Sequence, residues 1–411
     1  MKEINVGIIG LGGRGYGNLK TIMDCGSINI VAICDVYEDR IERAAKEMEE
    51  RGWKEPKKTV DYREILNDKE VNTVFVFSSW ETHVRIAIEA MRAGKAVGME
   101  VGGAYHLEEC FELVEAWEET KVPLMMLENC CFGKKELLGL NLARAGLLGE
   151  IVYCHGAYAH DLREEVAKGK ENRHYRLENY KHRNCENYPT HELGPIAKVV
   201  DINRGNKMNR LVSVATKAAG LKKYIDDRKD TIENKELIGY DFKQADIVET
   251  IITCENGEVI SIRLDTTLPR SYNREFTLRG TAGMYEEATN SVFLDGDEEF
   301  FETEKYAAIA MNNAERFYHQ YIPPYWSKRR NNNNSISGHG GLDAYTFSVF
   351  FHCLKNDLPM PIDVYDAASW MAITPLSEQS IKTGEAVEIP DFTKGNWKNR
   401  DRYDVTEIDI F

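Results

Sequence analysis

The sequence predicts an α/β protein in which an N-terminal doubly wound parallel sheet precedes a C-terminal α+β domain with an open, largely antiparallel sheet. Three observations support this prediction. Apolar runs alternate with amphipathic stretches over the first 130 residues, a glycine-rich turn follows the first run, and closely spaced strand patterns take over beyond about residue 150. A chain of 411 residues exceeds what one hydrophobic core usually supports, so we expect two domains, residues 1–130 and 131–411.

In the first domain, short β-type runs alternate with charged helical patterns. Strands that alternate with helices in this way form a parallel sheet with helices on both faces. The predicted strands are Ile4–Gly10, Asn29–Asp35, Thr73–Ser78, Ala96–Met99 and Val122–Leu127. The helical patterns between them include Arg40–Arg51, Thr82–Ala93 and Leu107–Thr120.

Beyond about residue 150 the pattern changes to a series of strand candidates, several of them bounded by turn signals. The predicted strands are Ile151–His160, Leu211–Lys217, Ala245–Cys254, Glu258–Thr267 and Arg274–Arg279. Glu255-Asn256-Gly257 predicts a hairpin, because Asn-Gly accepts positive φ at both positions. Two helices are expected near the end of the chain, Leu342–Leu354 and Val364–Lys382, and the polar run Asn331–Asn334 is expected to be an exposed loop.

Composition limits the kinds of partner. With 43% hydrophobic and 29% charged residues, and no apolar run of about 18 residues, the chain is typical of a globular protein without a membrane span. The formal net charge of -15 disfavours nucleic acid and anionic membranes as partners. The nine cysteines include no C-x-x-C pair, so we expect no metal site. We expect them to be reduced thiols in a cytoplasmic protein. The start of the chain does not resemble a secretory signal.

The glycine-rich turn predicts a dinucleotide site. Gly10-Leu11-Gly12-Gly13-Arg14-Gly15 joins the first strand to a helix, and Asp35 follows 20 residues beyond Gly15 at the end of the next strand. Such glycines let the backbone approach a pyrophosphate at a helix N-terminus, and the carboxylate binds a ribose hydroxyl pair. Because Asp35 would repel a 2′-phosphate, the expected cofactor is NAD.

Several further residues lie where later strands of the same sheet end. Ligands bind beyond the carboxyl ends of strands in open α/β sheets, so we expect these residues to line one pocket. They are Ser78, Ser79, Trp80, His83, Glu100, Val101, Glu128 and Asn129.

Together these residues resemble the Gfo/Idh/MocA superfamily, whose members join an NAD(P)-binding Rossmann domain to an open-sheet substrate domain. Most members are sugar or inositol dehydrogenases with a Glu-Lys-Pro motif after the fifth strand. Here the segment is Glu100-Val101-Gly102, so the lysine that assists the oxidised hydroxyl is missing.

The departure is accounted for by a narrower resemblance, to the NAD-dependent α-N-acetylgalactosaminidases of glycoside hydrolase family 109. It spans nearly the whole chain. The matching segments include Gly12–Gly15, Trp80–His83, Glu128–Cys131, Tyr158–Leu162, Arg183-Asn184, Tyr188–His191, Asp265-Thr266 and Gly338–Gly341. Two residues depart from the family pattern: Glu192 and Cys185 stand where the family usually has glycine.

The resemblance implies two sets of ligand contacts. The implied NAD contacts are Gly13, Arg14, Asp35, Trp80 to His83, Glu100, Val101 and Asn129. The implied sugar contacts are Tyr158, Arg176, Tyr188, Pro189, Thr190, His191 and Tyr272. It also implies a homo-oligomer, because the open sheets of the family commonly pair through their exposed faces.

The implied chemistry is a redox-assisted elimination: oxidation at sugar carbon 3, loss of the carbon 2 proton with expulsion of the group at carbon 1, hydration, and re-reduction. His191 is the expected base for the oxidised hydroxyl, since an imidazole titrates near neutrality. Tyr188 or Tyr158 is expected to take the carbon 2 proton, which requires a lowered tyrosine pKa. Arg176 is expected to anchor a sugar oxygen or acetamide, and Glu128 to act on the leaving group.

Two other functions fit the same residues. A dehydrogenase or epimerising oxidoreductase acting on a free sugar would accumulate NADH or alter a stereocentre. A catalytically idle NAD-binding regulator would do neither, although the presence of His191 and both pocket tyrosines argues against it.

Overall fold

The computed structural model of the chain describes residues 3–26, 28–297, 312–329, 339–408 and 410. They form two compact units. The first lies within Met1–Phe132, Asn332–Ala368 and Tyr403–Phe411, and the second within Gly133–Asn331 and Ser369–Arg402. The loop expected at Asn331–Asn334 falls outside the described residues.

A six-stranded sheet forms the centre of the first unit. Its order is β3-β2-β1-β4-β5-β6, and every neighbouring pair is parallel. The strands are β1 (Asn5–Ile9), β2 (Asn29–Cys34), β3 (Lys57–Thr59), β4 (Thr73–Val76), β5 (Ala96–Met99) and β6 (Leu124–Met126). The prediction of a doubly wound parallel sheet is confirmed. The direction of winding reverses at β1 and β4, which is where such sheets bind ligands.

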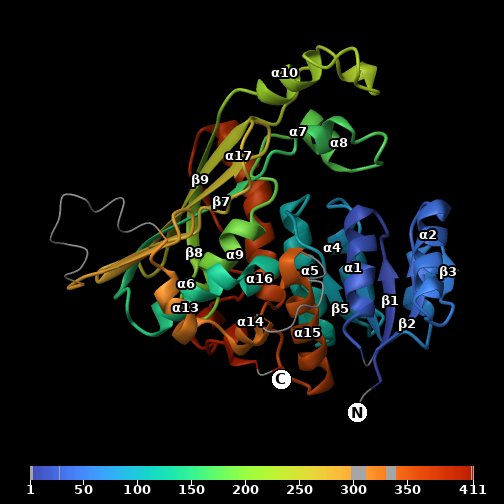
Figure 1. The fold of residues 1–411 in the computed structure, drawn as a ribbon, viewed down its shortest axis with the longest axis horizontal. Coiled ribbons are helices and arrows are strands. Elements are labelled where there is room, and N and C mark those ends of the chain that lie inside the picture. Colours follow the sequence, from blue (N-terminus) through green and yellow to red (C-terminus); the bar gives the residue numbers. More distant parts are fainter. Residues whose placement is uncertain (1–2, 27, 298–311, 330–338, 409, 411) are drawn as a thin grey trace. The chain divides into compact units, whose positions relative to one another are not determined.

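Helices connect these strands (Figure 1). They are α1 (Gly13–Met23), α2 (Glu38–Glu50), α3 (Tyr62–Asn67), α4 (His83–Arg92) and α5 (Leu107–Thr120), followed by the 3-10 turn η1 (Asn129–Phe132). Helix α2 shows why the sequence forms these elements: Ile41, Ala44, Ala45 and Met48 recur at helical spacing and are buried, while the charged residues between them face outward.

A segment distant in sequence completes the core of the first unit. It consists of η3 (His339–Gly341) and α15 (Leu342–Lys355). The ring of Phe75 on β4 lies 5.4, 5.1 and 5.6 Å from those of Phe347, Phe350 and Phe351 on α15. This helix therefore belongs to the first unit although it lies far beyond residue 130; the predicted boundary there stays a prediction.

An eight-stranded sheet forms the second unit, in the order β13-β12-β11-β7-β10-β9-β8-β14. Its strands are β7 (Ile151–Ala159), β8 (Met208–Ala215), β9 (Ile247–Cys254), β10 (Val259–Asp265), β11 (Thr277–Gly280), β12 (Gly283–Glu286), β13 (Ser291–Leu294) and β14 (Val387–Glu388). All pairs are antiparallel except β7 with β10, which confirms the largely antiparallel open sheet. The predicted hairpin joins β9 to β10, with Gly257 at φ +100°.

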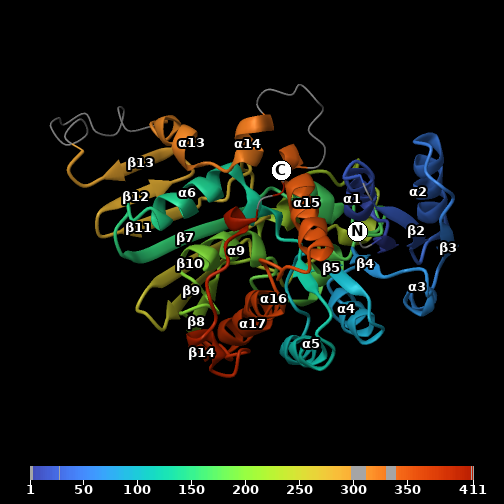
Figure 2. The ribbon, with the colours of Figure 1, turned by 90° about the horizontal axis from the view of Figure 1, so that it is seen from below.

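Helices α9 and α17 pack against strands of this sheet (Figure 2). The helices of the second unit are α6 (Lys134–Arg144), α7 (Arg163–Ala167), α8 (Arg176–His182), α9 (Thr190–Val199), α10 (Gly220–Asp226), α13 (Glu315–Tyr321), α14 (Pro324–Arg329) and α17 (Ile373–Thr383), with 3-10 turns η2 (Lys235–Leu237) and η4 (Asn396–Lys398). Helix α16 (Val364–Met371) crosses from the first unit to the second, and the 3-10 turn η5 (Val405–Glu407) belongs to the first. Helix α9 approaches β7 closely at Gly156, where a Cβ would come within 2.9 Å of the Glu192 side chain.

The single helix predicted over Val364–Lys382 is instead two, α16 and α17, separated at Ala372. Pro375 explains the break, since its ring clashes with the carbonyl four residues earlier and it has no N–H to donate. Within the described part of the chain, no helix combines the length and apolar composition needed to cross a bilayer.

Candidate active site

In the first unit, the glycine-rich turn is shaped by close backbone approaches on one side and open space on the other. A Cβ on Gly10, whose φ is +96°, would lie 2.6 Å from the carbonyl oxygen of Phe77, and one on Gly15 would collide with the carbonyl of Gly10. A Cβ on Gly13 would meet nothing within 4 Å, and one on Gly12 would reach only Arg40, at 3.5 Å. The turn therefore packs tightly beneath helix α1 while its outer side stays accessible.

Asp35 lies directly beside this turn. Its carboxylate accepts hydrogen bonds from the backbone N–H groups of Leu11 (2.7 Å) and Tyr37 (3.0 Å). Arg40 lies 3.6 Å from the same carboxylate. These contacts hold the buried acidic side chain at the end of β2 and against the start of α1, the position that a ribose-binding carboxylate occupies in this fold.

Arg14, inside the turn, is tied to three other groups. Its guanidinium donates to Glu100 (3.0 Å) and makes a two-pronged ion pair with Asp343 of α15 (2.7 and 2.8 Å). His339 lies 2.8 Å from both Arg14 and Asp343. Burial raises the pKa of Asp343, but its bonds to His339 and Arg14 outweigh burial, so the pKa lies below its ordinary value.

Residues after β5 and β6 join the same network. Glu100 also accepts hydrogen bonds from the Asn18 amide (3.1 Å) and the Val101 backbone (3.0 Å). Asn129 donates to Asp343 at 2.7 Å. The sequence-predicted residues Arg14, Glu100, Val101 and Asn129 are thus brought together, and Asp343, which sequence reasoning missed, links three of the segments.

Of the remaining predicted residues of this unit, Trp80 and His83 are buried, whereas Ser78 and Ser79 are half-buried. Burial lowers the pKa of His83 to about 4, so its imidazole is neutral at pH 7. A Cβ on Gly102, at φ +137°, would collide with the indole of Trp80. The Ser78 hydroxyl is buried without a hydrogen-bond partner among the described residues.

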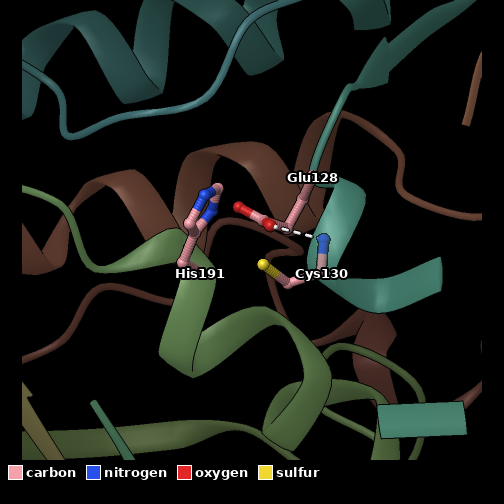
Figure 3. A group of neighbouring side chains, drawn as sticks. All are labelled: Glu128, Cys130 and His191. Carbon is pink, nitrogen blue, oxygen red and sulfur yellow. Dashed lines mark hydrogen bonds between the residues drawn. The ribbon is translucent and has the colours of Figure 1, made fainter. Parts of the chain in front are cut away.

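Glu128 follows β6 and is fully buried. Figure 3 shows its carboxylate accepting a hydrogen bond from the backbone N–H of Cys130, at 3.0 Å. This bond closes the first turn of η1 and fixes the orientation of the carboxylate. The same figure shows His191, which belongs to the second unit and projects from the first turn of α9.

These residues fit NAD. The open side of the glycine turn at the N-terminus of α1 suits a pyrophosphate, Asp35 suits a ribose hydroxyl pair, and the orphaned Ser78 hydroxyl lies at the strand edge where ligands bind.

In the second unit, three rings gather at the end of β7 and the start of α9. The centroids of Tyr158 and Tyr188 are 4.5 Å apart, and the His191 ring lies 5.5 and 4.8 Å from them. Pro189 immediately precedes the first residue of α9, a position that suits its fixed φ and its missing N–H. Tyr188 and His191 lie three residues apart and share one face of that turn.

Arg176, the first residue of α8, lies over both tyrosines. Its guanidinium carbon is 5.0 Å from the ring centroid of Tyr188 and 5.8 Å from that of Tyr158, and its Nε pairs with Glu165 at 3.2 Å. Arg176 is also hydrogen-bonded to the Tyr158 side chain. A buried cation with two aromatic faces and an ion-pair partner is held rigidly and can offer donors to an oxygen-rich ligand.

The expectation of a lowered tyrosine pKa is wrong for Tyr158. Burial raises its pKa above the ordinary value, and the opposing effect of Arg176 is smaller. The Tyr158 hydroxyl lies 3.2 Å from Nδ1 of His160, a residue that sequence reasoning did not single out. Alternation along a strand end, Tyr158 then His160, is the signal that would have found it.

The other predicted sugar contacts differ in exposure. Tyr272 is 46% exposed and lies 5.1 Å from the His160 ring and 6.5 Å from the Tyr158 ring. Thr190 is fully buried, and its hydroxyl has no hydrogen-bond partner among the described residues. Tyr272 therefore offers a face to solvent, whereas Thr190 lies in the interior.

Two buried carboxyl groups, Glu186 and Glu192, interact with each other beside this cluster. Glu186 also accepts from the Tyr188 backbone N–H at 3.2 Å. Burial raises the pKa of Glu186 to about 8, so at neutral pH this pair holds a proton. The sequence showed Glu192 as a departure from the family pattern but gave no sign of its partner.

Two family models match the chain. The first, described as an oxidoreductase family with an NAD-binding Rossmann fold, covers residues 4–128. The second, the C-terminal domain of glycosyl hydrolase 109, covers residues 132–399.

Curated relatives match almost end to end. A glycosyl hydrolase family 109 protein of Stenotrophomonas maltophilia is 34% identical over 97% of this chain and 91% of its own length. An alpha-N-acetylgalactosaminidase of Bacteroides fragilis is 34% identical over 96% of this chain and 93% of its own.

Solved structures share the fold at low identity. Levoglucosan dehydrogenase in complex with NADH and levoglucosan has a TM-score of 0.68 at 18% identity, covering 95% of this chain and all of that chain. Scyllo-inositol dehydrogenase from Lactobacillus casei, with bound NAD(H) and scyllo-inositol, has a TM-score of 0.64 at 13% identity, covering 94% and 99%.

Proposed function

This chain belongs to glycosyl hydrolase family 109 and is an NAD-dependent glycosidase, and we propose that it acts on α-N-acetylgalactosaminide-like glycosides by transient oxidation at sugar carbon 3. The observation that carries the proposal is the cluster of buried Tyr158, Tyr188 and Arg176 with half-buried His191, which combines two phenols, a guanidinium and an imidazole in one place. The substrate class follows the relative from Bacteroides fragilis that is named for that activity.

His191 is proposed to accept the proton of the carbon 3 hydroxyl. Its imidazole stands at the first turn of α9, where packing against Tyr158 and Tyr188 restricts its orientation. An imidazole nitrogen with a free lone pair can accept the proton of a sugar hydroxyl, which is the role of a general base. Val101 stands where most superfamily dehydrogenases have the lysine of the Glu-Lys-Pro motif, so that motif supplies no lysine to the carbon 3 hydroxyl here.

Tyr158 and Tyr188 are the proposed groups at carbon 2, and Arg176 the anchor for a sugar oxygen or acetamide oxygen. A ketone at carbon 3 acidifies the neighbouring carbon 2 proton, so removing it requires only a modest base. Arg176 carries several N–H donors and no acceptor, which suits an oxygen that gains negative charge as that proton leaves. Tyr272, partly exposed beside these rings, offers a flat face to a sugar. Pro189 and Thr190 would shape the base of the sugar site.

In the first unit, the proposed NAD contacts are Gly10, Gly12, Gly13, Arg14, Gly15, Asp35, Ser78, Trp80, His83, Glu100, Val101 and Asn129. When bound, NAD⁺ would supply a hydride acceptor for carbon 3 and, in reduced form, the donor that restores it, so that the overall reaction would be hydrolysis. Arg14 and Asn129 are oriented by Asp343, and Glu100 holds the turn against β5. Glu128 is proposed to protonate the leaving group.

The test is a pair of simultaneous absorbance measurements on purified protein with p-nitrophenyl α-N-acetylgalactosaminide. We expect nitrophenol release without net NADH formation, and loss of release by at least about 100-fold in His191→Ala. His182→Ala, on the exposed end of α8, is the control and should match the wild type. Steady NADH formation with free sugars and no glycoside cleavage would instead establish a dehydrogenase, the function of the structurally similar proteins.

We also propose that the chain forms a homo-oligomer through the face of the second sheet that carries exposed apolar residues. The side chains of Val212, Val214 and Ile251 are 39%, 64% and 37% exposed on the paired strands β8 and β9. Such a patch favours self-association. Val214→Glu should shift the mass measured by light scattering toward the monomer; an unchanged mass at low concentration would contradict this interface.

A cytoplasmic location is proposed from the state of the cysteines. All nine are free thiols, and eight of them are buried. Persistent free thiols are typical of a reducing compartment. Fractionation of the native host, with the protein detected by antibody, tests the location; recovery in an extracytoplasmic fraction would contradict it.

A further inference from the structure

We propose that His160 receives the hydroxyl proton of Tyr158 at the moment when Tyr158 takes the carbon 2 proton of the sugar, so that Tyr158 works as a neutral relay and never as a free phenolate. The inference rests on the proposed function, because it assigns the carbon 2 step to Tyr158. His160 acts through Tyr158 and is a positioning residue.

The geometry of the pair comes from the end of β7. Tyr158 and His160 are two residues apart and project to the same side. The tyrosine oxygen lies 3.2 Å from Nδ1 of the imidazole, and the two rings are nearly perpendicular, at 85°. The backbone N–H of His160 donates to the carbonyl of Asp265 at 2.9 Å, and this bond holds the backbone from which the imidazole projects.

Two different neighbours bond to the Tyr158 hydroxyl. Arg176 has only donors, so the tyrosine oxygen must accept from it. The hydroxyl proton is then directed to the group that can accept it, Nδ1 of His160, which places the histidine proton on Nε2. The tyrosine oxygen thus already gives its proton to an imidazole while it accepts from a guanidinium.

A free phenolate is disfavoured at this position. Burial raises the pKa of Tyr158, and the carboxylates of Glu165 and Glu192 raise it further, against the lowering effect of Arg176. At neutral pH the residue is therefore a neutral phenol, which is a weak base until its own proton leaves.

The surroundings of His160 keep its imidazole neutral. Burial lowers its pKa, as do the cation of Arg176 and, to a smaller extent, His191. Glu165 and Asp161 act in the opposite direction, and Asp161 is itself bound by Arg163 at 2.7 Å. Tyr272 covers another side of the ring without charge. A neutral imidazole with a free lone pair on Nδ1 is the required acceptor.

The step balances in protons and electrons. The bond between carbon 2 and its hydrogen breaks, and its electron pair remains on the sugar, which becomes the enolate of the carbon 3 ketone. A new O–H bond forms on Tyr158 as its original O–H bond breaks, and that proton forms an N–H bond to Nδ1. His160 becomes an imidazolium, the enolate expels the carbon 1 substituent, and the reverse transfer later returns a proton to carbon 2.

The first test is the pH dependence of kcat in the NAD-loaded enzyme. His160→Gln keeps an oxygen that can accept the tyrosine hydrogen bond but cannot take up the proton. We expect kcat at pH 7 to fall by roughly 100- to 1,000-fold. The kcat of the variant should then rise about tenfold per pH unit between pH 7 and 9, since only the ionised phenol of Tyr158 remains as a base. The wild type should lack this alkaline rise.

His182→Gln is the matched control, because it makes the same chemical change at an exposed position of the same unit. A fall in kcat of the same size at every pH would show that His160 is only structural, and an unchanged kcat would overturn the relay outright. A double-mutant cycle gives an independent reading. If the relay exists, adding His160→Gln to Tyr158→Phe costs little more; additive losses would overturn it.

Exchange at carbon 2 separates failure of the relay from failure of the proposed function. In D₂O, wild-type enzyme should place deuterium at carbon 2 of the released sugar, detected by NMR, whereas His160→Gln should do so at the reduced rate of cleavage. If the wild type neither cleaves nor exchanges, the proposed function is wrong and the relay with it. If the wild type does both and the variant exchanges equally fast at pH 7, only the relay is wrong.

Discussion

The two units hold their polar groups in different ways. In the first, charges are matched: Arg14 contacts the carboxylates of Glu100 and Asp343. In the second, the buried Arg176 lies over the rings of Tyr158 and Tyr188, with Glu165 as its carboxylate partner. Matched charges keep the same protonation state across a wide pH range, whereas buried phenols and imidazoles can exchange protons. The first arrangement suits retention of a charged cofactor, and the second suits proton movement.

Buried carboxyl groups show the same contrast. Asp343 in the first unit has a lowered pKa because His339 and Arg14 stabilise its ionised form more than burial destabilises it. Glu186 in the second unit has its pKa raised to about 8, because burial dominates and its partner is another carboxyl. Environment, rather than residue type, therefore decides which unit carries fixed charge.

The largest effect is expected from removing the cation of the second unit. Arg176→Met retains much of the side-chain volume but removes the charge and the donors that Tyr158 accepts. Since the developing charge at carbon 2 then has no cation beside it, kcat/KM should fall by roughly 1,000-fold. Steady-state nitrophenol release measures it.

Arg228→Met is the control for Arg176. Its guanidinium lies 3.8 Å from the Tyr224 ring centroid, but on the surface, so activity should be unchanged. An equal loss of kcat/KM in Arg176→Met and Arg228→Met would contradict the prediction, because it would show that Arg176 has no role beyond that of a surface cation–aromatic contact.

A smaller effect is expected from removing one carboxylate of the ion-pair network in the first unit. Asp343→Asn removes the two-pronged partner of Arg14 and weakens the hold on Asn129. NAD affinity should fall about tenfold, which corresponds to about 1.4 kcal/mol. Titration calorimetry of NAD-depleted protein measures this affinity. The control is Asp24→Asn, in an exposed pair with Arg51, which should leave the NAD affinity unaltered. An unaltered NAD affinity in Asp343→Asn would mean that the network only stabilises the fold.

The smallest effect concerns Glu186. Its folded pKa of about 8 exceeds the unfolded value near 4.3, so the folded state binds the extra proton between these values and stability falls as pH rises through them. Glu186→Gln removes that loss and still accepts from Tyr188. Relative to the wild type, the variant should gain about 1 kcal/mol more at pH 8.5 than at pH 5, since Glu192 shares the titration.

Thermal denaturation at the two pH values measures the Glu186 effect. Glu255→Gln, on the hairpin between β9 and β10, provides the exposed comparison. A pH-independent difference between Glu186→Gln and the wild type would mean that Glu186 is ionised throughout this range.

Local patterns were sufficient to predict most of the fold. The strand over Ala96–Met99 and the helix over Leu107–Thr120 have the predicted bounds, and the glycine turn opens α1 as expected. The short strands β3 and β14 were missed because two or three residues give no periodicity. These successes share a cause: the information lies within a few neighbouring residues.

Long-range and environmental features were not predictable in this way. Nothing near Asp343 in the sequence indicates that it binds Arg14, 329 residues away. Nor could the sequence tell how deeply Tyr158 is buried, and burial is what made the expectation of a lowered pKa wrong. The roles given to the individual site residues stay predictions until the variants are measured.

The position of α15 also has a consequence for how the protein is made. The ring of Phe75 is covered by phenylalanines that are synthesised more than 270 residues later, and Asp343, the partner of Arg14, is synthesised 329 residues after it. The amino-terminal sheet is therefore incomplete during most of translation. We therefore expect stable cofactor loading to follow the synthesis of α15, since a nascent chain released before residue 355 lacks the complete helix that finishes its dinucleotide-binding half.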